Sequence, residues 1–150
     1  MRRENLPSGA IVSFTYTTPV RFADVDHAGI VYYPRFFHYF HVAFEELWRT
    51  RIGPKAYSDI IDNQRIGFPA VRAECDFKSP LRFGDSAEIE VSIPRLGAKS
   101  ITFRYRIFRS GDRALCAEGQ VITAVVDLAK FVAVAVPEHV TGMLKDLVES

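Results

Sequence analysis

The segment from Pro34 to Trp48 most restricts the folds open to this chain. Its apolar residues recur at helical spacing in two adjacent rows, Phe36, Phe40, Ala43 and Leu47 in one and Phe37, Phe44 and Trp48 in the other. Pro34 suits the first turn of a helix, where its missing N–H costs nothing. A helix that is apolar over most of its circumference is normally buried. We therefore expect a long helix in the centre of the fold, ended by Gly53 and Pro54.

Much of the remaining chain has the two-residue period of β-strands. Apolar residues, many of them β-branched or aromatic, alternate with polar ones. The expected strands are Ile11–Phe22, Val71–Phe77, Ala87–Ile93, Ile101–Phe108, Leu115–Val126 and Phe131–Val136. Phe22 falls on the apolar face of the first strand, and turn residues such as Gly84-Asp85 and Gly111-Asp112 separate later ones. We expect Lys55–Asn63 to form a short helix or turn and Val140–Val148 a final helix.

This order of elements predicts an α+β fold. Short turns between successive strands imply antiparallel neighbours, and a sheet that alternates apolar and polar residues needs a cover on its apolar face. The buried helix is the natural cover, so we expect an antiparallel sheet wrapped around a long central helix. The open edges of such a sheet could be joined across a two-fold axis. We therefore expect a homodimer, or a dimer of dimers that forms a homotetramer.

Length, charge and cysteine content indicate one soluble domain, residues 1–150, with a loose start up to about Gly9. Hydrophobic residues make up 48% of the chain, enough for a core. The net charge of +1 gives no global field that would attract nucleic acid or a membrane. The N-terminal segment lacks the apolar region of a signal peptide, and no window approaches a span of about 20 apolar residues. Two distant cysteines, Cys75 and Cys116, favour reduced thiols and a cytoplasmic location.

A polar motif directly precedes the apolar helix, in the segment RFADVDHAGIVYYPRFF (residues 21–37). This connection brings Asp26 close to the helix N-terminus, where free N–H groups and the macrodipole favour negative charge. An oxyanion formed there would be stabilised by backbone donors. A nearby carboxylate could attack an acyl carbon or activate water, and Gly29 permits a positive φ. On spacing alone, an N-cap without catalytic function is the commoner role for such an aspartate.

The same segment resembles the N-terminal motif of the 4-hydroxybenzoyl-CoA thioesterase family, D-x-D-x-x-G-x-V-[YW]. The matching residues are Asp24, Asp26, Gly29, Val31 and Tyr32. Downstream, CDFKSPLRFGDSAEIEV (Cys75–Val91) resembles the family's next motif, a strand followed by a proline and a Gly-Asp turn. The resemblance covers most of the chain. It implies the hotdog fold and thioester substrates.

By this resemblance, the protein is expected to be an acyl-CoA thioesterase without metal or redox cofactor, with coenzyme A as part of substrate and product. The second aspartate of the motif, Asp26, corresponds to the catalytic carboxylate, acting either as nucleophile through a mixed anhydride or as general base on water. The backbone N–H that binds the thioester oxygen corresponds to that of Tyr33, with Gly29 shaping the loop. Asp24 is expected to order the loop by hydrogen bonding.

Histidines around the motif leave alternatives open. His27 could tune the charge of Asp26 or touch the substrate, and a solvated role is equally open. His38, His41 and Glu45 share one helix face, which would suit a metal site. Surface or interface histidines are the commoner outcome, so no metal is expected. The family can place an acidic residue on the helix to bind a substrate hydroxyl; His41 occupies the matching position, a departure from that pattern.

Further substrate contacts are expected from aromatic and basic residues. Tyr32 and its aromatic neighbours could line an acyl pocket, although most of these rings are expected in the core. In the resembling family, basic side chains near strand turns hold the phosphates of coenzyme A. Arg95 and Lys99, which flank a turn at Gly97, are the best candidates here. A solvated face of the sheet is an equally open interpretation.

Two rival functions share the expected fold, because a fold alone does not determine an activity. A hotdog dehydratase or hydratase would add water to an enoyl-CoA without releasing a free thiol. A non-catalytic acyl-CoA binding protein would bind without turnover, and substitution of Asp26 would change nothing. The thioesterase interpretation, by contrast, predicts thiol release that depends on Asp26, from an aromatic or short-chain acyl-CoA.

Overall fold

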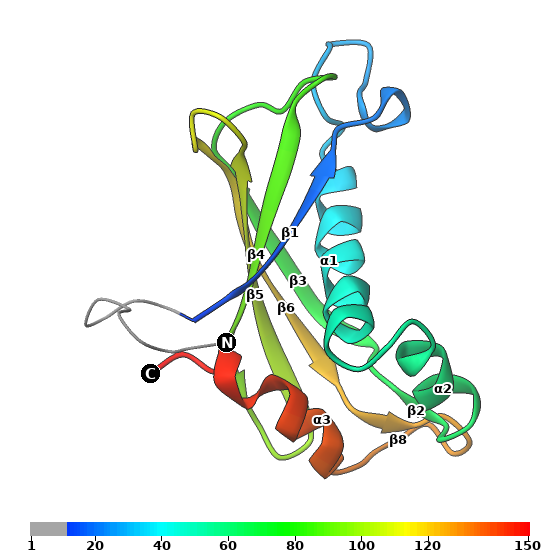
Figure 1. Cartoon of the computed structure of the whole chain (residues 1–150). Helices are drawn as coiled ribbons and strands as arrows, with labels where there is room; N and C mark the ends of the chain where they lie inside the picture. Colours follow the sequence, from blue (N-terminus) through cyan, green and yellow to red (C-terminus); the bar gives the residue numbers. More distant parts are fainter. Residues whose placement is uncertain (1–11) are drawn as a thin grey trace.

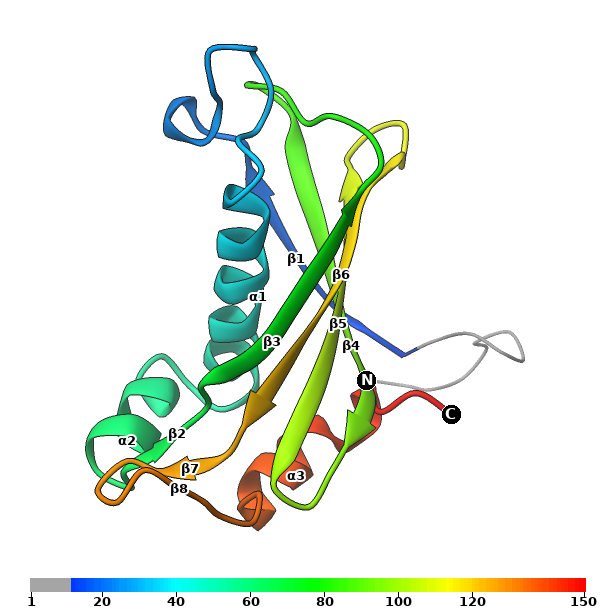
Figure 2. The ribbon, with the colours of Figure 1, turned by 180° about the vertical axis from the view of Figure 1, so that it is seen from behind.

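The computed structural model describes residues 12–150, so the expectations for the chain up to Ile11 lie outside the described residues. Its longest helix, α1 (Arg35–Arg51), packs against one face of a five-stranded antiparallel sheet, seen from opposite sides in Figures 1 and 2. The strands are β1 (Phe14–Pro19), β3 (Ala70–Phe77), β4 (Ser86–Leu96), β5 (Ser100–Arg109) and β6 (Leu115–Ala124). The predicted α+β architecture, a sheet around a long helix, is confirmed.

The order of strands in the sheet, β1-β4-β5-β6-β3, places β3 at an edge beside β6. Strands β4, β5 and β6 follow one another through short turns, as predicted. Because β3 and β4 are not neighbours, the connection between them, residues 78–85, crosses the end of the sheet. We call it the crossing loop. It lies at the same end of the molecule as the connection from β1 to α1, at the top of Figure 1.

The apolar rows of α1 form the centre of the core. Phe36, Phe40, Ala43, Phe44, Leu47 and Trp48 are at most 6% exposed. The ring of Phe40 stacks on Tyr105 of β5 with centroids 4.7 Å apart, and Phe44 meets Phe103 of β5 edge to face at 5.4 Å. Each such side chain contributes roughly 1.5–3 kcal/mol by its burial. This packing holds the N-terminus of α1 in a defined place relative to the sheet.

Two predicted strands differ in the structure. Strand β1 ends at Pro19, which cannot donate to the ladder, and a short 3-10 helix, η1 (Phe22–Asp24), follows. The ring of Phe22 is 78% exposed, so its predicted burial is wrong. Of the predicted strand Phe131–Val136, only β8 (Val132–Ala133) forms, because Phe131 has a positive φ of 54° that interrupts the alternation.

Strand β8 belongs to a second, small sheet that the sequence did not predict. Its other members are β7 (Val126–Asp127) and β2 (Ile66–Gly67). Helix α2 (Ala56–Asp62) forms where a short helix or turn was expected. Helix α3 (Glu138–Leu144) begins before the expected Val140 and is continued by the 3-10 helix η2 (Lys145–Leu147). Within residues 12–150, every helix is too short or too polar to traverse a lipid bilayer.

Candidate active site

The connection from β1 to α1 contains a small hairpin, residues 25–31. Val25 and Val31 pair as an antiparallel bridge. The N–H of Asp26 donates to the carbonyl of Ile30 at 2.9 Å, and the N–H of Gly29 donates to the carbonyl of Asp26 at 3.0 Å. Gly29 has a φ of +84°, a conformation that residues with side chains rarely adopt. The backbone therefore needs glycine at this turn, and the turn holds Asp26 at the base of the hairpin.

Asp24 is buried and orders this connection, as its position in the motif suggested. Its Oδ2 accepts hydrogen bonds from the N–H of Arg21 at 2.9 Å and from the hydroxyl of Tyr39 in α1 at 3.0 Å. Its carbonyl accepts the N–H of Tyr32 at 2.9 Å. Burial, and then the negative charge of Asp24, raise the pKa of Tyr39, which therefore stays a donor. Asp24 thus links the connection to α1 through Tyr39 and joins its early part to Tyr32, near its end.

Asp26, by contrast, keeps part of its carboxylate available. It is half-buried, and its Oδ1 accepts the N–H of Ala28 at 2.8 Å. Within residues 12–150, no donor reaches the other carboxylate oxygen, Oδ2. One oxygen orients the side chain while the second is free to act on a ligand. The motif predicts a chemical role for this aspartate, and a carboxylate with one free oxygen is suited to such a role.

The start of α1 provides a free backbone donor close by. The N–H groups of Tyr32 and Arg35 are occupied, by the carbonyls of Asp24 and Tyr32 respectively, and Pro34 has none. The N–H of Tyr33 finds no acceptor in the described part of the chain. It stands at the positive end of a helix of 17 residues. A carbonyl oxygen that gains negative charge near this N–H would be stabilised.

Two apolar cavities lie along α1 on the side of β3. The helix-start pocket, about 410 Å³, is lined among others by Val31, Tyr33, Phe36, Phe77, Pro80 and Leu81. The mid-helix pocket, about 300 Å³, is lined among others by Phe37, Phe40, His41, Phe44, Tyr57 and Val121. Mostly apolar pockets with a few polar groups are typical of small-molecule sites.

The other predicted contacts near the motif fall in different places. His41 lines the mid-helix pocket, and its Nε2 lies 3.1 Å from Oε1 of Glu45. His27 is exposed on the hairpin, and the exposed ring of Tyr32 lies 5.3 Å from that of Tyr33. Across residues 12–150, His, Cys, Asp and Glu side chains form no group of three that could hold a metal ion.

Arg95 and Lys99 lie far from the hairpin within one chain. Pairing of β1 with β4 sets Pro19 beside Ser86, at the hairpin end of the sheet, whereas Arg95 lies near the other end of β4. Both basic side chains are exposed. The structure therefore does not bring them to Asp26 from within the same subunit.

The cysteines have environments that disfavour a thiolate nucleophile. Burial, and then the charge of Asp76, raise the pKa of the half-buried Cys75 to about 11. Burial likewise raises the pKa of Cys116. A reactive cysteine needs its pKa lowered instead.

Sequence reasoning missed Tyr39 and Arg109. The sequence alone does not single them out, because an aromatic residue in a helix is usually part of the core and an arginine at the end of a strand is usually solvated. Only their tertiary partners reveal them: Tyr39 donates to Asp24, and Arg109 donates to the carbonyl of Pro80 in the crossing loop.

Comparisons with known proteins agree with the fold and identify its family. A 1,4-dihydroxy-2-naphthoyl-CoA hydrolase from Nostoc punctiforme is 35% identical over 64% of each chain. A 1,4-dihydroxy-2-naphthoyl-CoA thioesterase from Synechocystis superposes with a TM-score of 0.82 at 26% identity, covering 91% of this chain and 98% of that one. A gentisyl-coenzyme A thioesterase superposes with a TM-score of 0.75 at 32% identity, covering 87% of this chain and 98% of the other.

These likenesses define the chain as a hotdog-fold thioester hydrolase. More particularly, a family model described as the thioesterase-like superfamily matches residues 20–144, and the chain belongs to that superfamily.

Proposed function

We propose that the protein hydrolyses an acyl-CoA to the free acid and coenzyme A, with Asp26 as the catalytic carboxylate and the N–H of Tyr33 as the oxyanion donor. The observation that carries the proposal is the proximity in one short connection of a partly free carboxylate and an unpartnered N–H at a helix start. Relatives named as 1,4-dihydroxy-2-naphthoyl-CoA and gentisyl-CoA thioesterases support the substrate class.

Two routes through Asp26 fit this geometry. As nucleophile, its oxygen attacks the thioester carbon, the thiolate of coenzyme A leaves, and water then hydrolyses the mixed anhydride. As general base, it takes a proton from water while the water oxygen attacks the same carbon. Either route develops negative charge on the former carbonyl oxygen. The N–H of Tyr33 is the donor proposed to stabilise that charge.

The proposed acyl group is aromatic. The mid-helix pocket is lined largely by rings, which suit a flat apolar ligand, and His41 adds one polar contact. Because Nε2 lies 3.1 Å from Oε1 of Glu45, Nδ1 is the imidazole nitrogen proposed to contact a hydroxyl on the acyl group. The relatives whose names specify hydroxylated aromatic acyl groups support this choice.

A homodimer joined through β3 is proposed to complete the site. Strand β3 pairs with β6 on one side only, and its apolar residues Val71 and Phe77 are 64% and 49% exposed. Antiparallel pairing of two β3 edges across a two-fold axis would set the Arg95–Lys99 end of one subunit at the Asp26 end of the other. In that arrangement these basic residues could hold the coenzyme A phosphates of the partner's substrate.

Substitution of Asp26 tests whether it is the catalytic carboxylate. A panel of aromatic, short-chain and long-chain acyl-CoAs is assayed for thiol release with native protein, Asp26→Asn and the control Asp62→Asn, whose carboxylate is exposed on α2. Asp26→Asn is expected to lower kcat by about two or more orders of magnitude, as for loss of a general base or nucleophile. Asp62→Asn should retain the native rate.

Each rival outcome of this assay has a distinct signature. Native-rate hydrolysis by Asp26→Asn would remove Asp26 from the mechanism. Addition of water to an enoyl-CoA without thiol release would identify a hydratase. Tight binding of acyl-CoA without turnover, in the native protein and in Asp26→Asn alike, would identify a binding protein.

A further inference from the structure

The crossing loop contributes to the lining of the helix-start pocket. Pro80 and Leu81 line this pocket together with Val31 and Tyr33. The carbonyl of Leu81 accepts the N–H of Val31 at 2.8 Å, and the side chain of Leu81 is fully buried. Val31 in turn bridges to Val25 and lies two residues before Tyr33. The middle of the crossing loop therefore contributes to the position of the hairpin, beside the bonds that Asp24 makes to Tyr39 and Tyr32.

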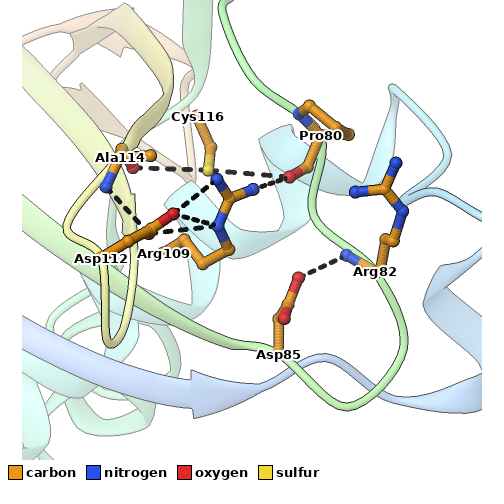
Figure 3. Close-up of polar contacts among 7 residues, drawn as sticks. All are labelled: Pro80, Arg82, Asp85, Arg109, Asp112, Ala114 and Cys116. Atoms are coloured by element: carbon orange, nitrogen blue, oxygen red, sulfur yellow. Dashed lines mark hydrogen bonds and ion pairs between the residues drawn. The ribbon is translucent and has the colours of Figure 1, made fainter.

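Arg109, the last residue of β5, holds the middle of this loop from the other side. Figure 3 shows its guanidinium between Asp112 and the backbone of Pro80. Nη1 donates to the Pro80 carbonyl at 2.6 Å, while Nε and Nη2 donate to Asp112 at 3.1 and 2.9 Å. Asp112 is itself fixed, because it accepts the N–H of Ala114 at 3.1 Å. A planar guanidinium that bonds to Asp112 along one edge and to the Pro80 carbonyl along another is held in one orientation. It therefore fixes the position of the Pro80 carbonyl.

The ends of the crossing loop have separate anchors. At its start, the N–H groups of Lys78 and Ser79 donate to the carbonyl of Cys116 at 2.8 and 3.3 Å. At its end, the carbonyl of Asp85 accepts the N–H of Val20 at 2.8 Å. Among the described residues outside the loop, Arg109 is the one charged side chain that bonds to it between these ends. Within the loop, the carboxylate of Asp85 accepts the N–H of Arg82 at 2.8 Å, and the thiol of Cys116 lies 4.0 Å from the Pro80 carbonyl oxygen. Loss of Arg109 would therefore loosen the loop at Pro80, while the anchors at its ends and the buried side chain of Leu81 stay in place.

We propose that Arg109 is a positioning residue for thioester hydrolysis. Through Pro80 and Leu81 it holds Val31, and with Val31 the free N–H of Tyr33 and the carboxylate of Asp26, in the arrangement that the reaction needs. This inference rests on the proposed roles of Asp26 and Tyr33. A displacement of about 1 Å between reacting groups can lower the rate about a hundredfold. The bond from Arg109 to the Pro80 carbonyl can therefore affect the rate although Arg109 does not contact the substrate.

The test compares Arg109→Ala and Arg109→Lys with the control Arg113→Ala. Arg113 lies near the same turn but pairs with Glu88 and Glu90 of β4, at 2.5 and 3.5 Å, and makes no bond to the crossing loop. Arg109→Ala should lower kcat about 10- to 100-fold with a smaller change in KM, because the loss falls on the transition-state geometry. Arg109→Lys should recover part of the rate, since an ammonium can reach one of the two partners. Arg113→Ala should keep the native kcat.

Two further readouts separate positioning from a general loss of stability. Amides of residues 24–33 should exchange hydrogen faster in Arg109→Ala than in the native protein, and at the native rate in Arg113→Ala. The double variant with Asp26→Asn should be no slower than Asp26→Asn alone, because both changes act on one unit.

Different variants test the proposed function and the positioning role of Arg109. If Asp26→Asn is as fast as native protein, the proposed function fails. If Arg109→Ala matches Arg113→Ala in both kcat and hairpin exchange, the positioning role is overturned. The positioning role would also be overturned if the loss of kcat in the double variant equalled the product of the losses in the two single variants.

Discussion

At the scale of single residues, two aspartates separated by one position have opposite environments. Asp24 is buried, and one of its carboxylate oxygens accepts two hydrogen bonds, whereas Asp26 is half-buried and keeps one oxygen free of donors from the described chain. A buried carboxylate that is bonded on several sides is suited to holding structure, because removing its partners is costly. A partly solvated one that is held by a single bond can change partners during a reaction.

The bond between Tyr39 and Asp24 should be measurable as stability. Tyr39→Phe removes a hydroxyl that donates at 3.0 Å to a buried carboxylate, so the free energy of unfolding should fall by about 1–3 kcal/mol. Urea unfolding provides the measurement. Tyr16→Phe on β1 is the control, because the hydroxyl of Tyr16 has no hydrogen-bond partner among the described residues and its loss should change stability by less than about 0.5 kcal/mol. Equal effects of the two substitutions would contradict the role given to Tyr39.

Cys75 should resist alkylation until high pH. Its pKa is raised from 9.0 to about 11, so the folded protein keeps the thiol proton to higher pH than the unfolded chain does. The resulting contribution to the free energy of unfolding is complete below pH 9 and is lost as the pH rises towards 11. At pH 8 the thiolate fraction is about one in a thousand. Iodoacetamide labelling of the Cys75 peptide, followed by mass spectrometry across pH, should reach half its maximum near pH 11. The same chain in urea should reach it near pH 9, and matching curves would refute the shift.

At the scale of elements, the contact between α1 and the sheet depends on a glycine in β6. A Cβ at Gly119 would collide with the carbonyl oxygen of Glu74 in β3 and lie 2.8 Å from the ring of Phe40. Gly119→Ala should therefore lower the free energy of unfolding by about 1–3 kcal/mol through overpacking. In contrast, Gly142→Ala in α3 meets open space and should raise it by about 0.5–1 kcal/mol. Thermal and urea unfolding would measure both, and a stabilising Gly119→Ala would show that β6 can move away from α1.

Elements with a strong local period were the ones that the sequence predicted well. The apolar rows of α1 and the alternation in β4 and β5 depend only on neighbours along the chain, and both are present as expected. The small sheet formed by β2, β7 and β8 was missed because strands of two residues carry no period. Phe22 was misplaced because alternation continues through η1 in the sequence although the strand has already ended at Pro19.

The candidate site was partly predictable for the same reason. Asp24, Asp26, Gly29 and Tyr33 lie within one short segment, and the motif selected them through its resemblance to a known family. Arg109 meets Pro80 only because β5 ends beneath a loop that crosses from one side of the sheet to the other. No residue spacing in the sequence indicates this contact between Arg109 and Pro80. The catalytic roles of Asp26 and Tyr33 stay predictions until the variants are measured.

At the scale of the whole molecule, the edge of β3 should determine the oligomeric state. Val71→Lys puts a charge on an exposed apolar position of that edge, and it should convert the proposed dimer to monomers and lower hydrolysis strongly, because the site then lacks its second subunit. Val132→Lys is the control, since Val132 is 50% exposed but lies on the small sheet. Light scattering after size-exclusion chromatography would measure the mass. A native monomer with full activity would contradict the proposed dimer.

The edge position of β3 also has a consequence for synthesis on the ribosome. Residues 70–77 are made well before their partner strand, residues 115–124, and at about 5–20 residues per second the interval amounts to several seconds. During that time residues 70–77, which favour the β conformation, have no partner strand to pair with. Its apolar residues are separated by the charged side chains of Arg72, Glu74 and Asp76, which act as gatekeepers against aggregation. The alternation that later separates the two faces of the finished strand thus protects the chain while it is still being made.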